Sequence, residues 1–264
     1  MARVIAVTNQ KGGVGKTTTC VNLAASLAAT KRRVLLVDMD PQGNATMGSG
    51  VDKNELQVSG YDVLTKRATA AEVIIHVDTA GFDLLGTNGD LTAAEVELMN
   101  EIGREHRLRM ALNEVRDNYD YILIDCPPSL NLLTVNALSA SDSVLIPMQC
   151  EYYALEGLAA LMNTIEQIKE TVNPNLQVEG ILRTMYDPRN SLTLDVSGQL
   201  NEYFGDKVYR AVIPRNVRLA EAPSYGLPAL KYDRASKGAI AYLALAGEMV
   251  RRHGLQKTSA AVAV

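Results

Sequence analysis

Short runs of apolar residues, bounded by turn-forming residues and separated by stretches of helical periodicity, recur along the whole chain. Two of these runs, Val34-Leu35-Leu36-Val37 and Tyr121-Ile122-Leu123-Ile124, are continuous rather than alternating. A continuous run is typical of a strand that is buried on both faces, as in a parallel sheet covered by helices. The predicted strands are 3–8, 33–38, 82–87, 121–126, 143–148, 178–185 and 208–213.

The stretches between the strands carry apolar residues at helical spacing. Leu23 and Leu27 lie four residues apart in the first stretch, and the segment 92–118 opens with the Thr92 to Glu95 spacing of a capping box. The predicted helices are 17–30, 92–118, 130–140, 154–171, 191–204 and 236–252. Because strands and helices alternate, we expect a doubly wound α/β fold, with a mostly parallel sheet flanked by helices and right-handed crossovers.

The composition is that of a globular protein: of 264 residues, 47% are hydrophobic and 21% are charged. No repeat or linker interrupts the pattern, so we expect one domain over residues 1–254 and a fraying tail over 255–264. No apolar run has the length of a membrane span. The first strand begins too early for a signal peptide, and we therefore expect a cytoplasmic protein.

The sequence does not indicate a disulfide, metal or catalytic site that uses cysteine or histidine. Cys20, Cys126 and Cys150 are odd in number and far apart, which argues against a disulfide framework and against a zinc site. We expect them to be buried as small hydrophobic residues. The three histidines are scattered and have no ligand spacing, so we expect surface or hydrogen-bonded core positions for them.

A glycine-rich segment, Lys11-Gly-Gly-Val-Gly-Lys16-Thr17-Thr18, connects the first predicted strand to the first predicted helix. This context is that of a phosphate-binding loop. The glycines let successive N–H groups and the helix N-terminus face phosphate groups, Lys16 reaches the β- and γ-phosphates, and Thr17 offers its hydroxyl to Mg²⁺. The segment therefore predicts a site for a nucleoside triphosphate with magnesium, and its second lysine, Lys11, needs a separate explanation.

Carboxylates end two of the predicted strands. Asp125 follows the apolar run that starts at Tyr121, where it is positioned to hold the water shell of Mg²⁺. Asp38 and Asp40 end the second strand, and their spacing predicts that both leave it on the same side, beside the γ-phosphate. We assign the orientation of the attacking water to Asp40, which is also considered as a magnesium ligand, and a supporting role to Asp38.

Positive charge gathers in the last third of the chain. Residues 183–257 contain 12 lysines and arginines against 7 acidic residues, a local charge of +5, whereas the rest of the chain carries −9. Such a region is either a solvated face or an anion-binding surface, and charge alone favours the solvated face.

The segment from Lys11 to Thr18 resembles the deviant Walker A box of the ParA/MinD family, in which a lysine precedes the glycines. The resemblance covers nearly the full length of the chain. Within this family, the chain as a whole resembles the Soj-type partition ATPases of the ParA branch. The segments that carry it are Val37-Asp-Met-Asp40-Pro-Gln-Gly-Asn-Ala-Thr, Ile124-Asp125-Cys-Pro-Pro-Ser129, Thr184-Met-Tyr-Asp-Pro-Arg189 and Ile213-Pro-Arg-Asn-Val-Arg-Leu-Ala-Glu-Ala-Pro223.

The resemblance implies an ATPase that uses ATP and Mg²⁺ and forms a homodimer in its ATP state. Lys11 then crosses to a phosphate held by the partner subunit, which explains the second lysine, because only the dimer is catalytically complete. The implied catalytic residues are Lys11, Lys16 and Asp40. The implied nucleotide-binding residues are Lys11, Gly12, Gly13, Val14, Gly15, Lys16, Thr17 and Thr18 in the loop and Met185, Pro214 and Asn216 around the adenine.

Partners also follow from the resemblance. Non-specific DNA binding falls on Arg189, Arg215 and Arg218, which would pair with phosphates without reading bases. A ParB-type centromere-binding protein is the implied stimulator of hydrolysis. These partners imply a nucleoid-associated protein without stable membrane association.

Three other activities of this fold stay open from the sequence. MinD-like membrane ATPases share the first box but end in a basic amphipathic helix, whereas this chain ends in Ala-Ala-Val-Ala-Val after Gly254 and lacks a bulky apolar face there. A metabolic ligase of the dethiobiotin synthetase type would need a small-molecule acceptor. An iron–sulfur reductase similar to the nitrogenase iron protein would need a bridging cysteine pair, and Cys126 has no evident second member.

Overall fold

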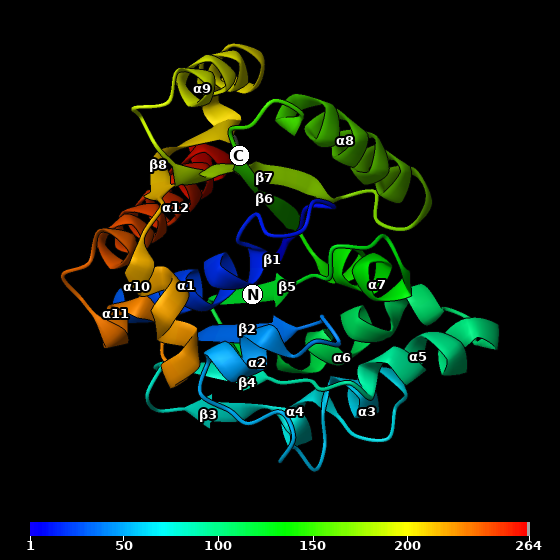
Figure 1. Cartoon of the computed structure of the whole chain (residues 1–264). Coiled ribbons are helices and arrows are strands. Elements are labelled where there is room, and N and C mark those ends of the chain that lie inside the picture. The colour runs from blue at the N-terminus through cyan, green and yellow to red at the C-terminus, as the bar shows by residue number, and fades with distance from the viewer. Residues whose placement is uncertain (263–264) are drawn as a thin grey trace.

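The computed structural model describes the backbone of residues 1–262 and the side chains of residues 1–254. Within this range one sheet has the strand order β3-β4-β2-β5-β1-β6-β7-β8 (Figure 1). Neighbouring strands are parallel, except that β3 and β4 are antiparallel. The predicted fold class is confirmed. The strands are β1 (Arg3–Val7), β2 (Val34–Asp38), β3 (Ile75–Val77), β4 (Phe82–Leu85), β5 (Tyr121–Asp125), β6 (Ser143–Gln149), β7 (Gln177–Tyr186) and β8 (Val208–Pro214).

The helices cover both faces of the sheet, with α6, α7 and α8 on one side and α1 with α12 on the other (Figure 1). Several short helices, among them α2, α3 and α4, lie in segments where the sequence pattern predicts none. The helices are α1 (Lys16–Ala29), α2 (Asn44–Gly48), α3 (Gly60–Leu64), α4 (Ala70–Val73), α5 (Leu91–Glu97), α6 (Arg107–Val115), α7 (Leu132–Ala140), α8 (Ala154–Thr171), α9 (Ser191–Phe204), α10 (Val217–Glu221), α11 (Ala229–Tyr232) and α12 (Lys237–Val262).

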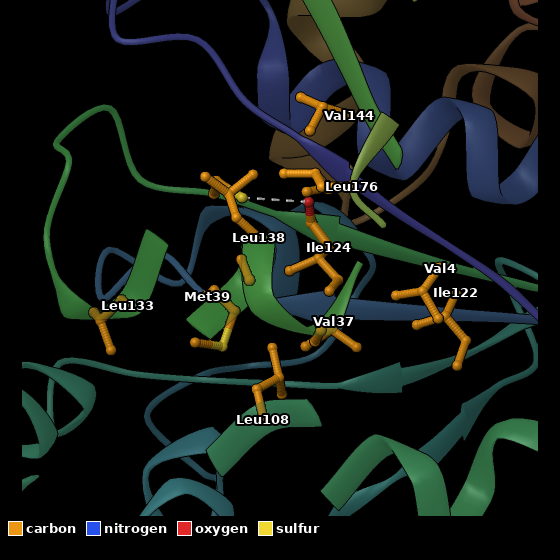
Figure 2. Close-up of a cluster of buried hydrophobic side chains, with 14 of the residues drawn as sticks. Val4, Val37, Met39, Leu108, Ile122, Ile124, Leu133, Leu138, Val144 and Leu176 are labelled. Atoms are coloured by element: carbon orange, nitrogen blue, oxygen red, sulfur yellow. Dashed lines mark hydrogen bonds between the residues drawn. The ribbon is translucent and has the colours of Figure 1, made fainter. Parts of the chain in front are cut away.

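Two buried clusters explain the continuous apolar runs, because alternate residues of each central strand point to opposite faces. Val4, Ile122 and Ile124 belong to the first cluster. Figure 2 shows them in the cluster that also contains Leu108 of α6 and Leu133 of α7. The intervening residues of the same strands belong to the second cluster, which packs against α1 and α12. The central strands are therefore apolar on both sides, as the sequence pattern indicates.

The prediction of one helix over 92–118 is wrong. The segment breaks between α5 and α6, where Gly103 adopts a left-handed φ of +68°. Asn136 of α7 stabilises the break, since its side chain donates to the carbonyl of Arg104 at 2.9 Å and accepts from the amide of Leu108 at 3.1 Å. The expected capping box also does not form, because α5 begins at Leu91 without a side-chain cap.

Helix α12 runs to Val262, past the expected end at residue 252. Of the tail expected over 255–264, the backbone to residue 262 continues this helix, and the side chains and residues 263–264 lie outside the described residues. No helix among the described residues combines the length and the apolar character needed to cross a bilayer.

The carboxyl ends of the central strands meet at one edge of the sheet. Asp125 at the end of β5 is in register with Val7 of β1 on one side and with Asp38 of β2 on the other. The connection from β1 runs through α1 to β2, and the connection from β5 runs through α7 to β6 on the opposite face of the sheet. The two connections therefore leave this edge in opposite directions. Ligands of doubly wound sheets bind at such a switch point, outside the carboxyl ends of the strands.

Candidate nucleotide site

The glycine-rich loop lies directly beyond the carboxyl end of β1 and leads into α1. Gly13 and Gly15 have left-handed φ values of +73° and +86°, which side chains other than glycine rarely adopt. Gly15 is the N-cap of α1, and no side chain caps this helix. The first amide groups of α1 thus face the loop without a side-chain acceptor, which is a geometry that binds anions. The hydroxyl of Thr184 in β7 donates to the carbonyl of Val14 at 2.8 Å and holds the loop in place.

The two lysines of the loop have different environments. Lys16 is buried, and its Nζ lies 3.3 Å from the carbonyl oxygen of Lys11, so it folds over its own loop. The Lys11 side chain is 49% exposed, and its Nζ forms an ion pair of 2.5 Å with Glu151, which precedes α8. Lys16 is therefore placed for a phosphate held by its own chain, whereas Lys11 is directed toward Glu151 and solvent.

Asp125 is fully buried beside the loop. Its Oδ1 accepts a hydrogen bond from the Cys20 thiol at 3.5 Å, and its Oδ2 has no partner among the described residues. Burial raises the pKa of Asp125, the neighbouring Asp38 raises it further, and a hydrogen bond from the Thr17 hydroxyl opposes both effects. A buried carboxylate oxygen without a donor is unfavourable by itself, so the position favours a cation.

Asp38 and Asp40 differ in burial and in hydrogen-bond partners. Strand β2 ends at Asp38, which is fully buried and accepts from the Thr46 amide at 2.8 Å and the Thr46 hydroxyl at 2.7 Å. Asp40 lies beyond the strand, where its Oδ1 accepts from the Gln42 amide at 3.0 Å. Because the strand ends at Asp38, strand alternation does not determine the direction of Asp40. Asp38 holds the loop before α2, and only Asp40 is partly exposed.

The residues implied for the adenine pocket lie around one cavity of about 200 Å³. Met185 comes from the end of β7, and Pro214 and Asn216 come from the end of β8 and the turn that follows. Gly15 and Thr18 line the same cavity, so it adjoins the phosphate loop. The side-chain oxygen of Asn216 is buried and has no partner in the described part of the chain, which leaves an acceptor for a ligand donor.

The three arginines implied for DNA binding follow the carboxyl ends of β7 and β8, so they share the edge of the sheet with the loop. Arg189 is 88% exposed and pairs with Asp187 at 2.8 Å, and its hydrogen bonds lower the pKa of Asp187 to about 2. Arg218 pairs with Glu221 at 2.7 Å. Arg215 is exposed and lines the small cavity.

The three cysteines take the buried positions that the sequence predicts. Cys20, Cys126 and Cys150 are buried and unbonded to one another. Burial raises the pKa of the Cys150 thiol to about 11. No group of three or more metal-ligating side chains gathers anywhere in the described range.

Sequence reasoning missed three residues that shape the site. Glu151 holds Lys11, Thr46 holds Asp38, and Thr184 holds the loop. Thr46 and Thr184 lie within segments that carry the family resemblance, which was the available signal for them. Glu151 lies 140 residues from its partner and carries no motif.

Comparisons with known proteins give consistent results. A family model described as an AAA domain matches residues 2–178. The chain is 54% identical over 249 residues to the sporulation initiation inhibitor protein Soj of Bacillus subtilis (strain 168), with 94% of this chain and 98% of that protein covered. It is 50% identical over 261 residues to the chromosome partitioning protein ParA of Caulobacter vibrioides (strain NA1000 / CB15N), with 98% of each covered. A solved structure of cobyrinic acid a,c-diamide synthase from Mycobacterium smegmatis, bound to an ATP analogue and magnesium, superposes with a TM-score of 0.84 at 38% identity over 96% of each chain.

Proposed function

From the premise that the chain belongs to the ParA/Soj family of P-loop ATPases, we propose that it is an ATP-driven DNA-partition switch. In this cycle ATP joins two subunits, the dimer binds DNA non-specifically, and a ParB-type partner stimulates the hydrolysis that releases the dimer. The cargo is a chromosome origin or a plasmid.

ATP would lie across the phosphate loop with its base in the cavity of about 200 Å³. The amides of the loop and of α1 then bind the phosphates, and Lys16 neutralises the β- and γ-phosphates. The base contacts Met185 and Pro214, and the unpaired oxygen of Asn216 accepts from an amino group of the base. This arrangement satisfies a buried acceptor that has no partner within the described chain.

Mg²⁺ fits the residues beside the loop. The Thr17 hydroxyl lies next to Asp125, whose Oδ2 is buried and unpaired among the described residues. Oxygen atoms are the ligands that Mg²⁺ prefers, and it commonly retains several waters, so Thr17 would bind it directly and Asp125 through water. When bound, the ion neutralises charge that develops on the phosphates.

The observation that carries the proposal is the position of Lys11. If both lysines bound the same nucleotide, both side chains would fold over the loop. The Lys11 side chain instead is half exposed and pairs with Glu151. An exposed ion pair contributes at most about 1 kcal/mol, so Lys11 can exchange Glu151 for a phosphate at little cost. In the proposed dimer that phosphate belongs to the nucleotide of the partner subunit.

Hydrolysis needs a group that orients water at the γ-phosphate. Asp40 is partly exposed, and its Oδ1 accepts from the backbone amide of Gln42. Its Oδ2 accepts no hydrogen bond from a described residue, which leaves this oxygen for a water. The buried Asp38 is occupied by Thr46 and has a supporting role, because it positions the loop that contains Asp40. A single weak base of this kind predicts slow turnover without a partner.

DNA binding would use the exposed arginines that follow β7 and β8. Arg189 and Arg218 are held in surface ion pairs, which contribute little and are readily replaced by DNA phosphates. Dimerisation doubles the number of these arginines on one assembly, and this gives a physical reason for ATP-dependent binding. Affinity should fall steeply with salt because the contacts release counterions.

The test measures DNA retention and subunit association with ATP, with ADP and without nucleotide, for the parent chain and for Lys11→Ala. The parent should sediment as a dimer and retain DNA only with ATP, or with a non-hydrolysable analogue, and magnesium. Lys11→Ala should bind nucleotide but stay a single subunit and lose DNA. Lys66→Ala, which removes an exposed lysine far from the loop in sequence, is the control and should behave as the parent. A normal ATP dimer of Lys11→Ala would overturn the proposal.

A second candidate is an ATP-dependent amide synthase, favoured by the 38% identity to the solved cobyrinic acid a,c-diamide synthase. The identity to Soj is higher, at 54%, and it also spans nearly the whole chain. Turnover that responds to a corrinoid acid and not to DNA with a partner protein would favour the synthase.

A further inference from the structure

A cavity of about 1060 Å³ lies at the edge of the sheet opposite the phosphate loop. It is lined by the first residues of β6, β7 and β8, by the turn Gly205–Lys207 and by α12 near residue 251. In parallel strands the amino ends share one edge, and the loop follows the carboxyl end of β1 at the other. This cavity is therefore separate from the proposed nucleotide site.

Cationic side chains from several elements line this cavity. They are Arg3, Arg183, Lys207, Arg210, Arg251 and Arg252. Of these, the Arg3, Arg210 and Arg251 side chains have no hydrogen bond or ion pair with any described residue. They come from β1, β8 and α12, so the tertiary structure gathers unpaired positive charges that the sequence spreads over most of its length.

Most of the acidic side chains in the cavity are already engaged. Glu248 pairs with Arg252 at 2.6 Å, and Asp142 pairs with Arg116, outside the lining, at 2.5 Å. Glu179 contacts the buried His253 at 2.9 Å. Asp206 is the lining carboxylate without such a partner among the described residues. The cavity consequently presents more free positive than free negative charge.

Arg183 supplies an independent observation at the wall of the cavity. The residue is 8% exposed, and its guanidinium donates to the Ser197 hydroxyl and the carbonyl of Tyr209, both at 2.8 Å, and to the carbonyl of Arg210 at 3.4 Å. Its Nε is buried without a partner, and no described carboxylate pairs with its guanidinium. A buried charge without a counter-ion is costly, so a bound anion would compensate it.

We propose that this cavity binds a soluble small molecule that carries two or more phosphate groups. Arginine is suited to phosphate because its planar guanidinium donates in a fork that matches two oxygens. Duplex DNA is a poor fit, since a wide cylinder contacts exposed side chains on a surface, whereas Arg183 is buried in the wall. The proposed ligand is therefore distinct from the DNA of the partition cycle.

The experiment is equilibrium dialysis with radiolabelled inorganic pyrophosphate, on full-length protein kept in excess ADP and Mg²⁺ so that the phosphate loop is filled. The test variant combines Arg210→Gln with Arg251→Gln. The control combines Arg109→Gln with Lys66→Gln, which removes the same charge from exposed positions that do not line the cavity. ADP binding by both variants reports that they are folded.

We expect one pyrophosphate site per parent chain and unchanged binding in the control. The test variant should bind at least about tenfold more weakly, because it loses two arginines that can form charged hydrogen bonds with phosphate. Absence of a pyrophosphate site in the parent, or equal binding by the test variant, would overturn the proposal. So would displacement of pyrophosphate by duplex DNA at equal phosphate concentration, because this would identify a surface for nucleic acid backbone. These outcomes do not depend on whether the chain acts as a DNA-partition ATPase, because the dialysis measures only pyrophosphate binding.

Discussion

The buried hydrogen-bond network at Glu179 gives a quantitative prediction about stability. Its carboxylate accepts from the Ser143 hydroxyl and the Tyr209 hydroxyl at 2.8 Å each and contacts His253 Nε2 at 2.9 Å. The other ring nitrogen of His253 is 3.0 Å from the Tyr121 hydroxyl. The network thus joins β5, β6, β7, β8 and α12. The perturbation is Glu179→Gln, which keeps the shape and an acceptor but removes the charge.

The size of the effect follows from the pKa of Glu179. Burial raises this pKa, but the hydrogen bonds from His253, Ser143 and Tyr209 outweigh burial and lower it from 4.5 to about 2. A difference of this size corresponds to about 3 kcal/mol of folding free energy at neutral pH. Because the folded-state pKa is the lower one, this contribution is present above pH 4.5 and is lost as the pH falls toward 2.

The assay is urea unfolding of the parent and of Glu179→Gln at pH ~7 and pH ~3.5. We expect the variant to be less stable by about 3 kcal/mol at the higher pH, and this difference to shrink by about 1 kcal/mol at the lower pH. Glu202→Gln is the control, because Glu202 is exposed and its side chain has no hydrogen bond or ion pair with another described residue. Its effect should stay within about 0.5 kcal/mol. If Glu179→Gln lowers the free energy of unfolding equally at both pH values, the lowered pKa of Glu179 does not contribute to stability. If it lowers this free energy no more than Glu202→Gln does, the hydrogen-bond network does not stabilise the protein.

Three further predictions concern the core, the loop and the DNA surface. Ile124→Ala removes a fully buried side chain of β5 and should lower the free energy of unfolding by about 2–5 kcal/mol in urea titration. Thr46→Val removes the 2.7 Å hydrogen bond to buried Asp38 and should destabilise the protein by about 1–3 kcal/mol in the same titration. Thr46→Ser keeps the hydroxyl and should therefore be less destabilised than Thr46→Val. Arg218→Glu should reduce DNA retention and lower the slope of affinity against salt by about one, and an unchanged slope in filter binding would exclude Arg218 from the DNA surface.

Local pattern was sufficient for the loop and for seven of the eight strands in the described residues, and it missed the three-residue strand β3 (Ile75–Val77). The apolar runs around Leu36 and Leu123 predict strands buried on both faces, and this holds because the two faces of a central strand meet two separate clusters. The loop was readable for a similar reason, since its glycines and its lysines lie next to one another in sequence and act through their own backbone. The break at Gly103 escaped prediction, because the groups that stabilise it come from Asn136, on another helix.

By itself, the sequence determined the fold class, the position of the phosphate loop and the family, because these depend on periodicity and on adjacent residues. Only the tertiary structure decided which partner each charged side chain has. Lys11 meets Glu151 across 140 residues, and Glu179 meets His253 across 74, because strand order and helix packing place them together. The same packing buries Asp38 and leaves Asp40 partly exposed, although the two are separated by one residue. Burial and partner choice are properties of the assembled chain, so no spacing rule in the sequence contains them.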